Sequence, residues 1–125
     1  MPPGPTAGEH DRGSVTAELA MALPTLMVVL AVGLYALAAV SLQGRCADAA
    51  YATARAVARG DDTAATRTHV LSVLPPGSTI RIGRTDPGLV TVQVEAPLPT
   101  PAGLHFAVNG KVIHASATAA EEAAP

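Results

Sequence analysis

Residues 13–44 read GSVTAELAMALPTLMVVLAVGLYALAAVSLQG and dominate the architecture of the chain. Between Leu19 and Gly44 there is no Asp, Glu, Lys or Arg, and 20 of the 24 residues from Leu19 to Leu42 are apolar. About 20 consecutive apolar residues form a helix long enough to cross a bilayer. The sequence therefore predicts one membrane-spanning helix near the N-terminus.

The helical pattern continues beyond the apolar run, with no strong stop before Gly60. A helix from Ser14 to that point would extend roughly 69 Å at 1.5 Å per residue, more than twice the ~30 Å of bilayer hydrocarbon. We therefore expect a transmembrane part at residues 14–43 and a projecting part of the same helix at residues 44–60.

The projecting part is amphipathic. Its charged residues recur at helical spacing, at Arg45, Asp48, Arg55 and Arg59, and the other side carries mostly alanine. Small side chains let another backbone approach closely, so this side suits packing against a sheet or a neighbouring helix. An ordinary buried helix face is the simpler interpretation. The residues expected to pack are Ala47, Ala50, Tyr51, Ala54 and Ala58.

The two ends of the chain lack the patterns of packed elements. Residues 1–13 contain three Pro and three Gly and have no apolar periodicity, so they predict a disordered leader. Residues 119–125, at the other end, predict a frayed tail.

A small α+β domain is expected at residues 61–118. Asp62 can cap a second, short helix, which the Pro75-Pro76 pair then ends. The inward-facing residues of this helix would be Val70, Val73 and Leu74.

From Ser78 onward the apolar period changes from 3.6 to 2, which predicts a small antiparallel sheet of about three strands. Ile80 and Ile82 alternate with polar residues, as do the valines between 90 and 94, and a turn at residues 85–88 joins the two strands. A third strand is expected near residues 111–118, and Asn109-Gly110 could turn a hairpin into it from residues 104–108.

Length and charge exclude several classes of function. A chain of 125 residues has room for one small domain, which excludes a multidomain enzyme. The net charge of −2 and the lack of a Lys/Arg cluster argue against nucleic-acid binding. The apolar core outside the span is thin, so a partner or an assembly is expected to support it.

The residues that usually carry chemistry are scattered. The four histidines lie in four different segments and Cys46 is the single cysteine, so we predict no metal site, no cofactor and no catalytic site. We interpret Cys46 as a small buried apolar residue rather than as half of an intermolecular bridge.

Glu18 stands at the start of the apolar run. A charge at the bilayer centre costs about 3 kcal/mol on insertion scales, less near the boundary, and such a group normally has a partner. Cleavage between Gly13 and Ser14 would create an α-amino group able to neutralise Glu18 in its own or an adjacent chain. Alternatively, Glu18 lies in the headgroup layer as a first-turn acid that the helix dipole favours.

The segment from Gly13 to Glu18, followed by LAMALPTLM, resembles the type IV prepilin cleavage signal of the TadE-like minor pilins of tight-adherence (Flp-type) pili, in particular their actinobacterial versions. The resemblance implies that a prepilin peptidase cleaves after Gly13, that Ser14 is the mature N-terminus and that Glu18 sets helix register during assembly. It also implies other pilins and an assembly platform as partners, and an extracytoplasmic domain on a single-pass membrane anchor. Leu19 departs from the aromatic residue that many members have there.

Pro24 lies inside the span and frees the carbonyl of Ala20, so we predict a helix kink or local unwinding there; a tolerated proline is the simpler interpretation. The basic residues after the span favour the orientation opposite to the one that the resemblance implies.

Two other classes remain open. A signal peptide cut after Ala38 would release a small binding domain. A chain that is never cleaved would be a single-pass anchored accessory subunit.

Overall fold

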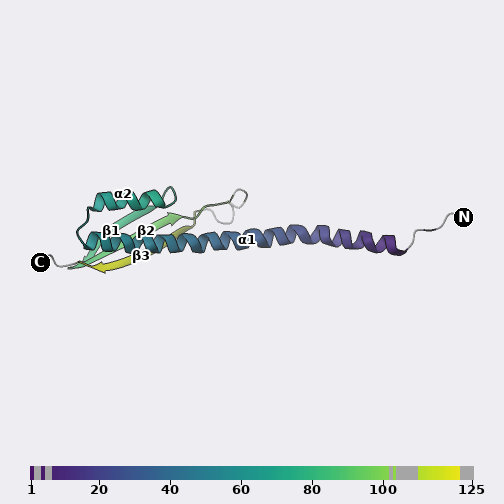
Figure 1. Cartoon of the computed structure of the whole chain (residues 1–125), viewed down its shortest axis with the longest axis horizontal. Helices are drawn as coiled ribbons and strands as arrows, with labels where there is room; N and C mark the ends of the chain where they lie inside the picture. Colours follow the sequence, from purple (N-terminus) through teal and green to yellow (C-terminus); the bar gives the residue numbers. More distant parts are fainter. Residues whose placement is uncertain (2–3, 5–6, 102, 104–109, 122–125) are drawn as a thin grey trace. The chain divides into compact units, whose positions relative to one another are not determined.

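The structure is a computed structural model of the chain, and it describes residues 1, 4, 7–101, 103 and 110–121. Two helices precede three strands (Figure 1), which confirms the predicted α+β arrangement. The chain divides into two compact units, Met1–Ala38 and Ala39–Pro125. The elements are α1 (Ala7–Ala58), α2 (Thr63–Val73), β1 (Thr79–Asp86), β2 (Leu89–Pro97) and β3 (Val112–Ala120).

Helix α1 begins at Ala7, earlier than the start predicted at Ser14, so the leader is not free of regular structure. Once a helix has nucleated, each added residue gains one hydrogen bond, so a long helix extends into a weakly helical flank.

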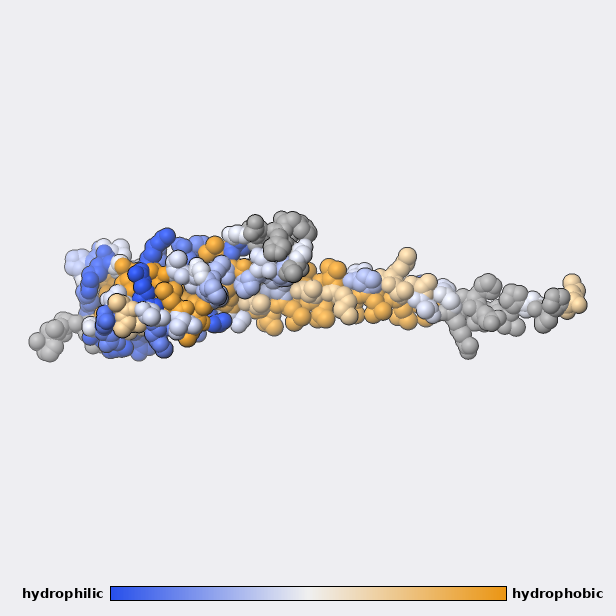
Figure 2. Space-filling view, turned by 90° about the horizontal axis from the view of Figure 1, so that it is seen from above, coloured by the Kyte–Doolittle hydropathy of each residue, from blue (hydrophilic) through white to orange (hydrophobic). Residues whose placement is uncertain are grey.

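The first unit consists mainly of the apolar part of α1, whose side chains are exposed. Leu19, Val29 and Leu37 expose 59%, 63% and 66% of their surface. Figure 2 shows this stretch as a run of hydrophobic side chains. By length and composition the segment Gly13–Ala58 can cross a membrane.

Helix α1 ends where the sequence predicts. Gly60 adopts a φ of +90°, and its N–H donates to the carbonyl of Val57 at 3.0 Å, while the N–H of Asp61 donates to that of Ala56 at 3.1 Å. These two bonds form a Schellman cap, which needs the left-handed conformation that glycine adopts without strain. Helix α2 then starts at the N-cap Asp62, whose carboxylate accepts from the N–H of Ala64.

The second unit contains a three-stranded antiparallel sheet in the order β1-β2-β3. The hairpin between β1 and β2 turns at Pro87-Gly88, and Gly88 has a φ of +83°. The central strand β2 alternates as predicted: its even-numbered residues from Val90 to Ala96 are fully buried, and the residues between them are not.

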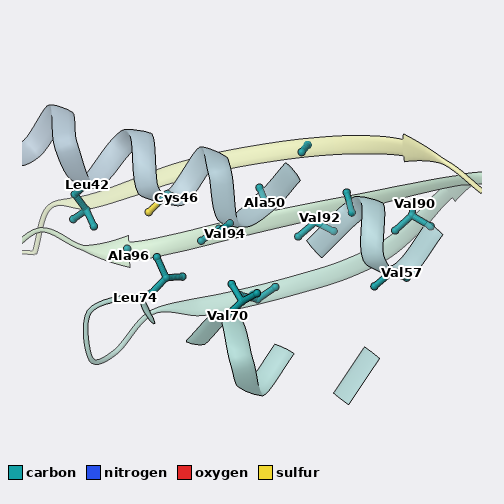
Figure 3. Close-up of a cluster of buried hydrophobic side chains, with 14 residues drawn as sticks. Leu42, Cys46, Ala50, Val57, Val70, Leu74, Val90, Val92, Val94 and Ala96 are labelled. Carbon is teal, nitrogen blue, oxygen red and sulfur yellow. The ribbon is translucent and has the colours of Figure 1, made fainter. Parts of the chain in front are cut away.

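Helices and sheet share one core, drawn in Figure 3. It joins Leu42, Cys46, Ala50 and Val57 of α1, Val70 of α2 and the C-cap residue Leu74 to the buried face of the sheet. Five of the fourteen buried members of this cluster are alanine and none is aromatic, so the core consists largely of small side chains.

Two expectations about the second unit need correction, and a third concerns residues that the structure does not describe. Val73 was expected to face inward, but it is 53% exposed, and the inward positions are taken by Val70 and by the C-cap residue Leu74. The tail was expected to fray from Ala119, but Ala119 and Ala120 belong to β3 and pair with Val90 and Leu89. The hairpin strand expected at residues 104–108 lies outside the described residues.

Candidate functional site

The predicted processing site lies inside α1. Gly13, Ser14 and Glu18 are all helical and exposed. A Cβ added at Gly13 would meet nothing within 4 Å, and its φ is not positive. The surrounding structure therefore gives no reason for glycine at this position.

Ser14 and Glu18 are four residues apart in one continuous helix. Residues i and i+4 share a helix face, with their Cβ atoms about 5–6 Å apart. An amino group on Ser14 would therefore lie within reach of the Glu18 carboxylate of the same chain.

Pro24 lies inside α1, which continues through it. Proline has no N–H to donate to the carbonyl four residues earlier, so one bond of the helical ladder is missing at Ala20. The predicted kink stays a prediction.

The projecting part of α1 buries a face at positions spaced by three and four residues. Of the residues expected to pack, Ala50, Ala54 and Ala58 lie in this buried face and Ala47 is half-buried. Tyr51 does not belong to the face, because it is 59% exposed. The complete face consists of Leu42, Cys46, Ala49, Ala50, Thr53, Ala54, Val57 and Ala58.

Sequence reasoning predicted the burial of Cys46 but did not assign Leu42, Ala49 or Thr53 to this face. The spacing of these four residues, by four, three and four positions, was a usable signal. Leu42 was instead assigned to the membrane span. The Thr53 hydroxyl donates to the carbonyl of Ala49 at 2.7 Å, which satisfies it within the helix.

Cys46 is fully buried, as interpreted from the sequence. Burial raises the pKa of its thiol, and the positive charge of Arg45 opposes this shift. A protonated thiol is a poor nucleophile, so Cys46 is a packing residue in the folded domain.

A shallow groove of about 340 Å³ lies between α1 and α2. Its lining includes Ala49, Ala52, Val70 and Val73, with Arg45, Asp48 and His69 among the polar residues. The Arg45 guanidinium donates to the carbonyl of Val73, which caps the C-terminus of α2.

The outer face of the sheet carries a polar row. Glu95 lies 3.5 Å from the Arg81 guanidinium and 3.6 Å from Nδ1 of His114. All three groups are solvent-accessible, so screening keeps these contacts weak. Within the described residues, no group of three or more His, Cys, Asp or Glu side chains could hold a metal ion.

Comparison with known proteins gives one informative relative. The chain is 42% identical over 67 residues to "Apoptosis inhibitor Rv3655c" of Mycobacterium tuberculosis, a match that covers 54% of this chain. The chain spans about half the length of that curated relative, with 53% of it covered. No family model and no solved structure matches the chain. An actinobacterial relative fits the actinobacterial TadE-like resemblance but does not establish the family.

Proposed function

We propose that this protein is a minor pilin, or pseudopilin, of a tight-adherence type IV pilus. It is processed after Gly13 and is assembled, or primes assembly, through the apolar part of α1. The observation that carries the proposal is the placement of Gly13, Ser14 and Glu18 directly before the apolar part of a long helix whose apolar side chains are exposed.

Processing requires the first turns of α1 to open, because a peptidase acts on an extended backbone and the Gly13–Ser14 bond lies inside the helix. Opening costs little here. Gly8 and Gly13 each disfavour helix by about 1 kcal/mol relative to alanine.

Cleavage changes the electrostatics of the helix start. The new amino group of Ser14 places positive charge at the positive end of the helix dipole, which is unfavourable by itself. Glu18 one turn later offsets that charge, in its own chain or in a neighbouring subunit. The carboxylate thereby becomes a contact that defines helix register between subunits.

The exposed apolar side chains of α1 need a nonpolar environment throughout the life of the protein. Lipid supplies it before assembly, and the helices of other pilins supply it afterwards. The partners are therefore membrane lipid, a prepilin peptidase, other pilins and the assembly platform. In this arrangement the unit Ala39–Pro125 lies on the extracytoplasmic side.

A released domain is the second candidate, and one observation favours it. The compact second unit begins at Ala39, which is also the first residue after the signal-peptide cut considered above. That product would retain the complete buried cluster of α1, α2 and the sheet.

The mass of the native protein's N-terminal peptide, measured in the membrane and secreted fractions, separates these functions. The pilin proposal expects a chain that begins at Ser14 in the membrane fraction. A first residue at Ala39 in the secreted fraction would replace it with the released domain. An intact leader would replace it with an uncleaved anchored subunit.

Glu18→Gln tests the assembly contact. The variant should insert and be cleaved as the wild type is, because the amide keeps the shape of the side chain. Its recovery with sheared pili or with co-purified pilins should fall about tenfold, because the charge that meets the Ser14 amine is lost. Glu9→Gln makes the same chemical change in the removed leader and should have no effect. Equal recovery of both variants would remove the assembly role of Glu18.

A further inference from the structure

Within the described residues, β3 is an edge strand, and the backbone groups on its outer edge can be identified residue by residue. The side-chain amide of Gln43 donates to the carbonyl of His114 at 3.1 Å, so that carbonyl points away from β2. The carbonyl of Lys111 accepts from the N–H of Leu98, and the N–H of Glu121 donates to Gly88. Because antiparallel strands alternate, the outward backbone groups belong to Val112, His114, Ser116, Thr118 and Ala120.

The opposite edge of the sheet is protected by an irregular register and by charged residues, both of which β3 lacks. Strand β1 has an irregular register between Arg84 and Asp86 and contains Arg81, Arg84 and Asp86. One outward carbonyl on each edge accepts from a side chain, Ile80 from Arg67 and His114 from Gln43, so these two bonds do not distinguish the edges. Strand β3 keeps an unbroken register along β2 and contains no proline, glycine, Asp, Glu, Lys or Arg. A flat edge of this kind is a template for another strand.

The charges that flank β3 are complementary to those of a second copy. If two β3 strands lie antiparallel with Ser116 opposite Ser116, Lys111 of each copy lies opposite Glu121 of the other. His114 then lies opposite Thr118, and these are outward-facing residues, as hydrogen-bonded pairs require. A shift of two residues would place Lys111 opposite Ala119 and lose both charge pairs.

We propose that β3 pairs with β3 of a second copy of this chain, antiparallel and centred on Ser116, so that two three-stranded sheets become one six-stranded sheet. The exposed Gln43 side chain releases the His114 carbonyl, which then accepts from the N–H of Thr118 in the second copy. Lys111 is exposed and available to the partner. Glu121 already binds Arg84 at 2.7 Å, and a carboxylate can accept from a second cation.

The pairing has a two-fold axis perpendicular to the sheet. It reverses the direction of every strand, and of the Ala39–Ala58 part of α1, between the copies. The two Ala39 residues therefore lie toward opposite ends of the pair, which suits copies carried by facing membranes or released domains. The proposal goes beyond the pilin function and does not depend on cleavage after Gly13.

Cysteine cross-linking of the full chain in detergent tests the register. In a Cys46→Ala background, Ser116→Cys should form disulfide dimers, because directly opposed residues lie about 5.5 Å apart between Cα atoms and disulfides span about 4.4–6.8 Å. Thr118→Cys is the matched control. Its two copies would be offset by about 13 Å along the strands and should not cross-link. A mixture of His114→Cys and Thr118→Cys chains should cross-link again.

Exchanging the charges of Lys111 and Glu121 tests the contacts between these residues of the two copies. The measured quantity is the dissociation constant of the dimer. Lys111→Glu or Glu121→Lys should each raise it about tenfold, and the double variant should restore it. The double variant also controls for the Arg84 contact that Glu121→Lys loses within one copy. The proposal is overturned if Ser116→Cys cross-links no more than Thr118→Cys, or if the double exchange leaves dimerisation as weak as the single variants do.

Discussion

Gly13 occupies a helical position at which a larger side chain would fit, since a Cβ there would meet nothing within 4 Å. We therefore attribute the proposed importance of Gly13 to recognition by the peptidase and not to a requirement of the fold. Glu18 is similar, because it is exposed on its own chain and acquires a role only beside a new amine or another subunit.

Gly13→Ala should separate folding from processing. Alanine is favoured over glycine in helices by about 1 kcal/mol, so the helical content should stay equal or rise slightly. The full-length precursor should accumulate in the membrane fraction, as measured by intact mass. Gly8→Ala makes the same change within the leader and should still be processed. Efficient processing of Gly13→Ala would argue against a prepilin-type signal.

Cys46 predicts a pH dependence of stability. Burial raises the pKa of its thiol in the folded state, so the folded chain holds this proton more tightly than the unfolded chain does. The stabilising contribution is complete below the unfolded-state pKa and is lost as pH rises through the folded-state pKa. Wild-type protein should therefore lose more stability than Cys46→Ala across that alkaline window, as measured by denaturant unfolding. Parallel losses in the two proteins would contradict the prediction.

At the level of elements, α1 serves two environments. Its apolar segment presents large aliphatic side chains on all sides, whereas its projecting part buries mainly alanines against the sheet. The alanines of α1 and the fully buried valines of β2 belong to one core cluster. Small side chains on the helix allow it to pack closely against the sheet, so the interface has little room for a larger side chain.

Ala54→Leu should therefore destabilise the domain. Ala54 is 1% exposed within the core cluster, and overpacking of such a site typically costs about 1–3 kcal/mol. Ala52→Leu adds the same atoms at an exposed position of α1 and should change the free energy of unfolding by less than about 0.5 kcal/mol. Urea denaturation followed by circular dichroism compares them. A similar cost for both variants would mean that α1 packs through a different face.

At the level of the whole molecule, the two compact units have different sources of stability. The unit Ala39–Pro125 contains the complete buried cluster, while the unit Met1–Ala38 exposes its apolar residues and depends on its surroundings. Lipid or a filament should therefore affect the first unit far more than the second.

Removal of residues 1–38 should leave the second unit folded. The fragment should unfold cooperatively at a midpoint within a few degrees of that of the full chain in detergent, because the core cluster is unchanged. Differential scanning calorimetry and amide exchange would measure this. A fragment without protected sheet amides would show that the second unit needs the apolar segment.

Local sequence patterns were sufficient to predict much of the secondary structure of this protein. The apolar run, the cap at Gly60, the N-cap at Asp62 and the alternation of β2 depend on short-range periodicity and backbone preference, so the α+β order was readable from residue spacing. The Gly13–Glu18 motif was equally visible, although its role depends on partners outside the chain.

Other features required the folded arrangement. Tyr51 and Val73 lie beside buried positions yet point outward, because the sheet covers an arc of each helix that composition does not specify. Thr53 is buried because it bonds its own helix, and Ala119 belongs to β3 because β2 is long enough to pair with it. Long-range packing decides which members of a periodic face are covered, and among the described residues it leaves β3 at an edge of the sheet.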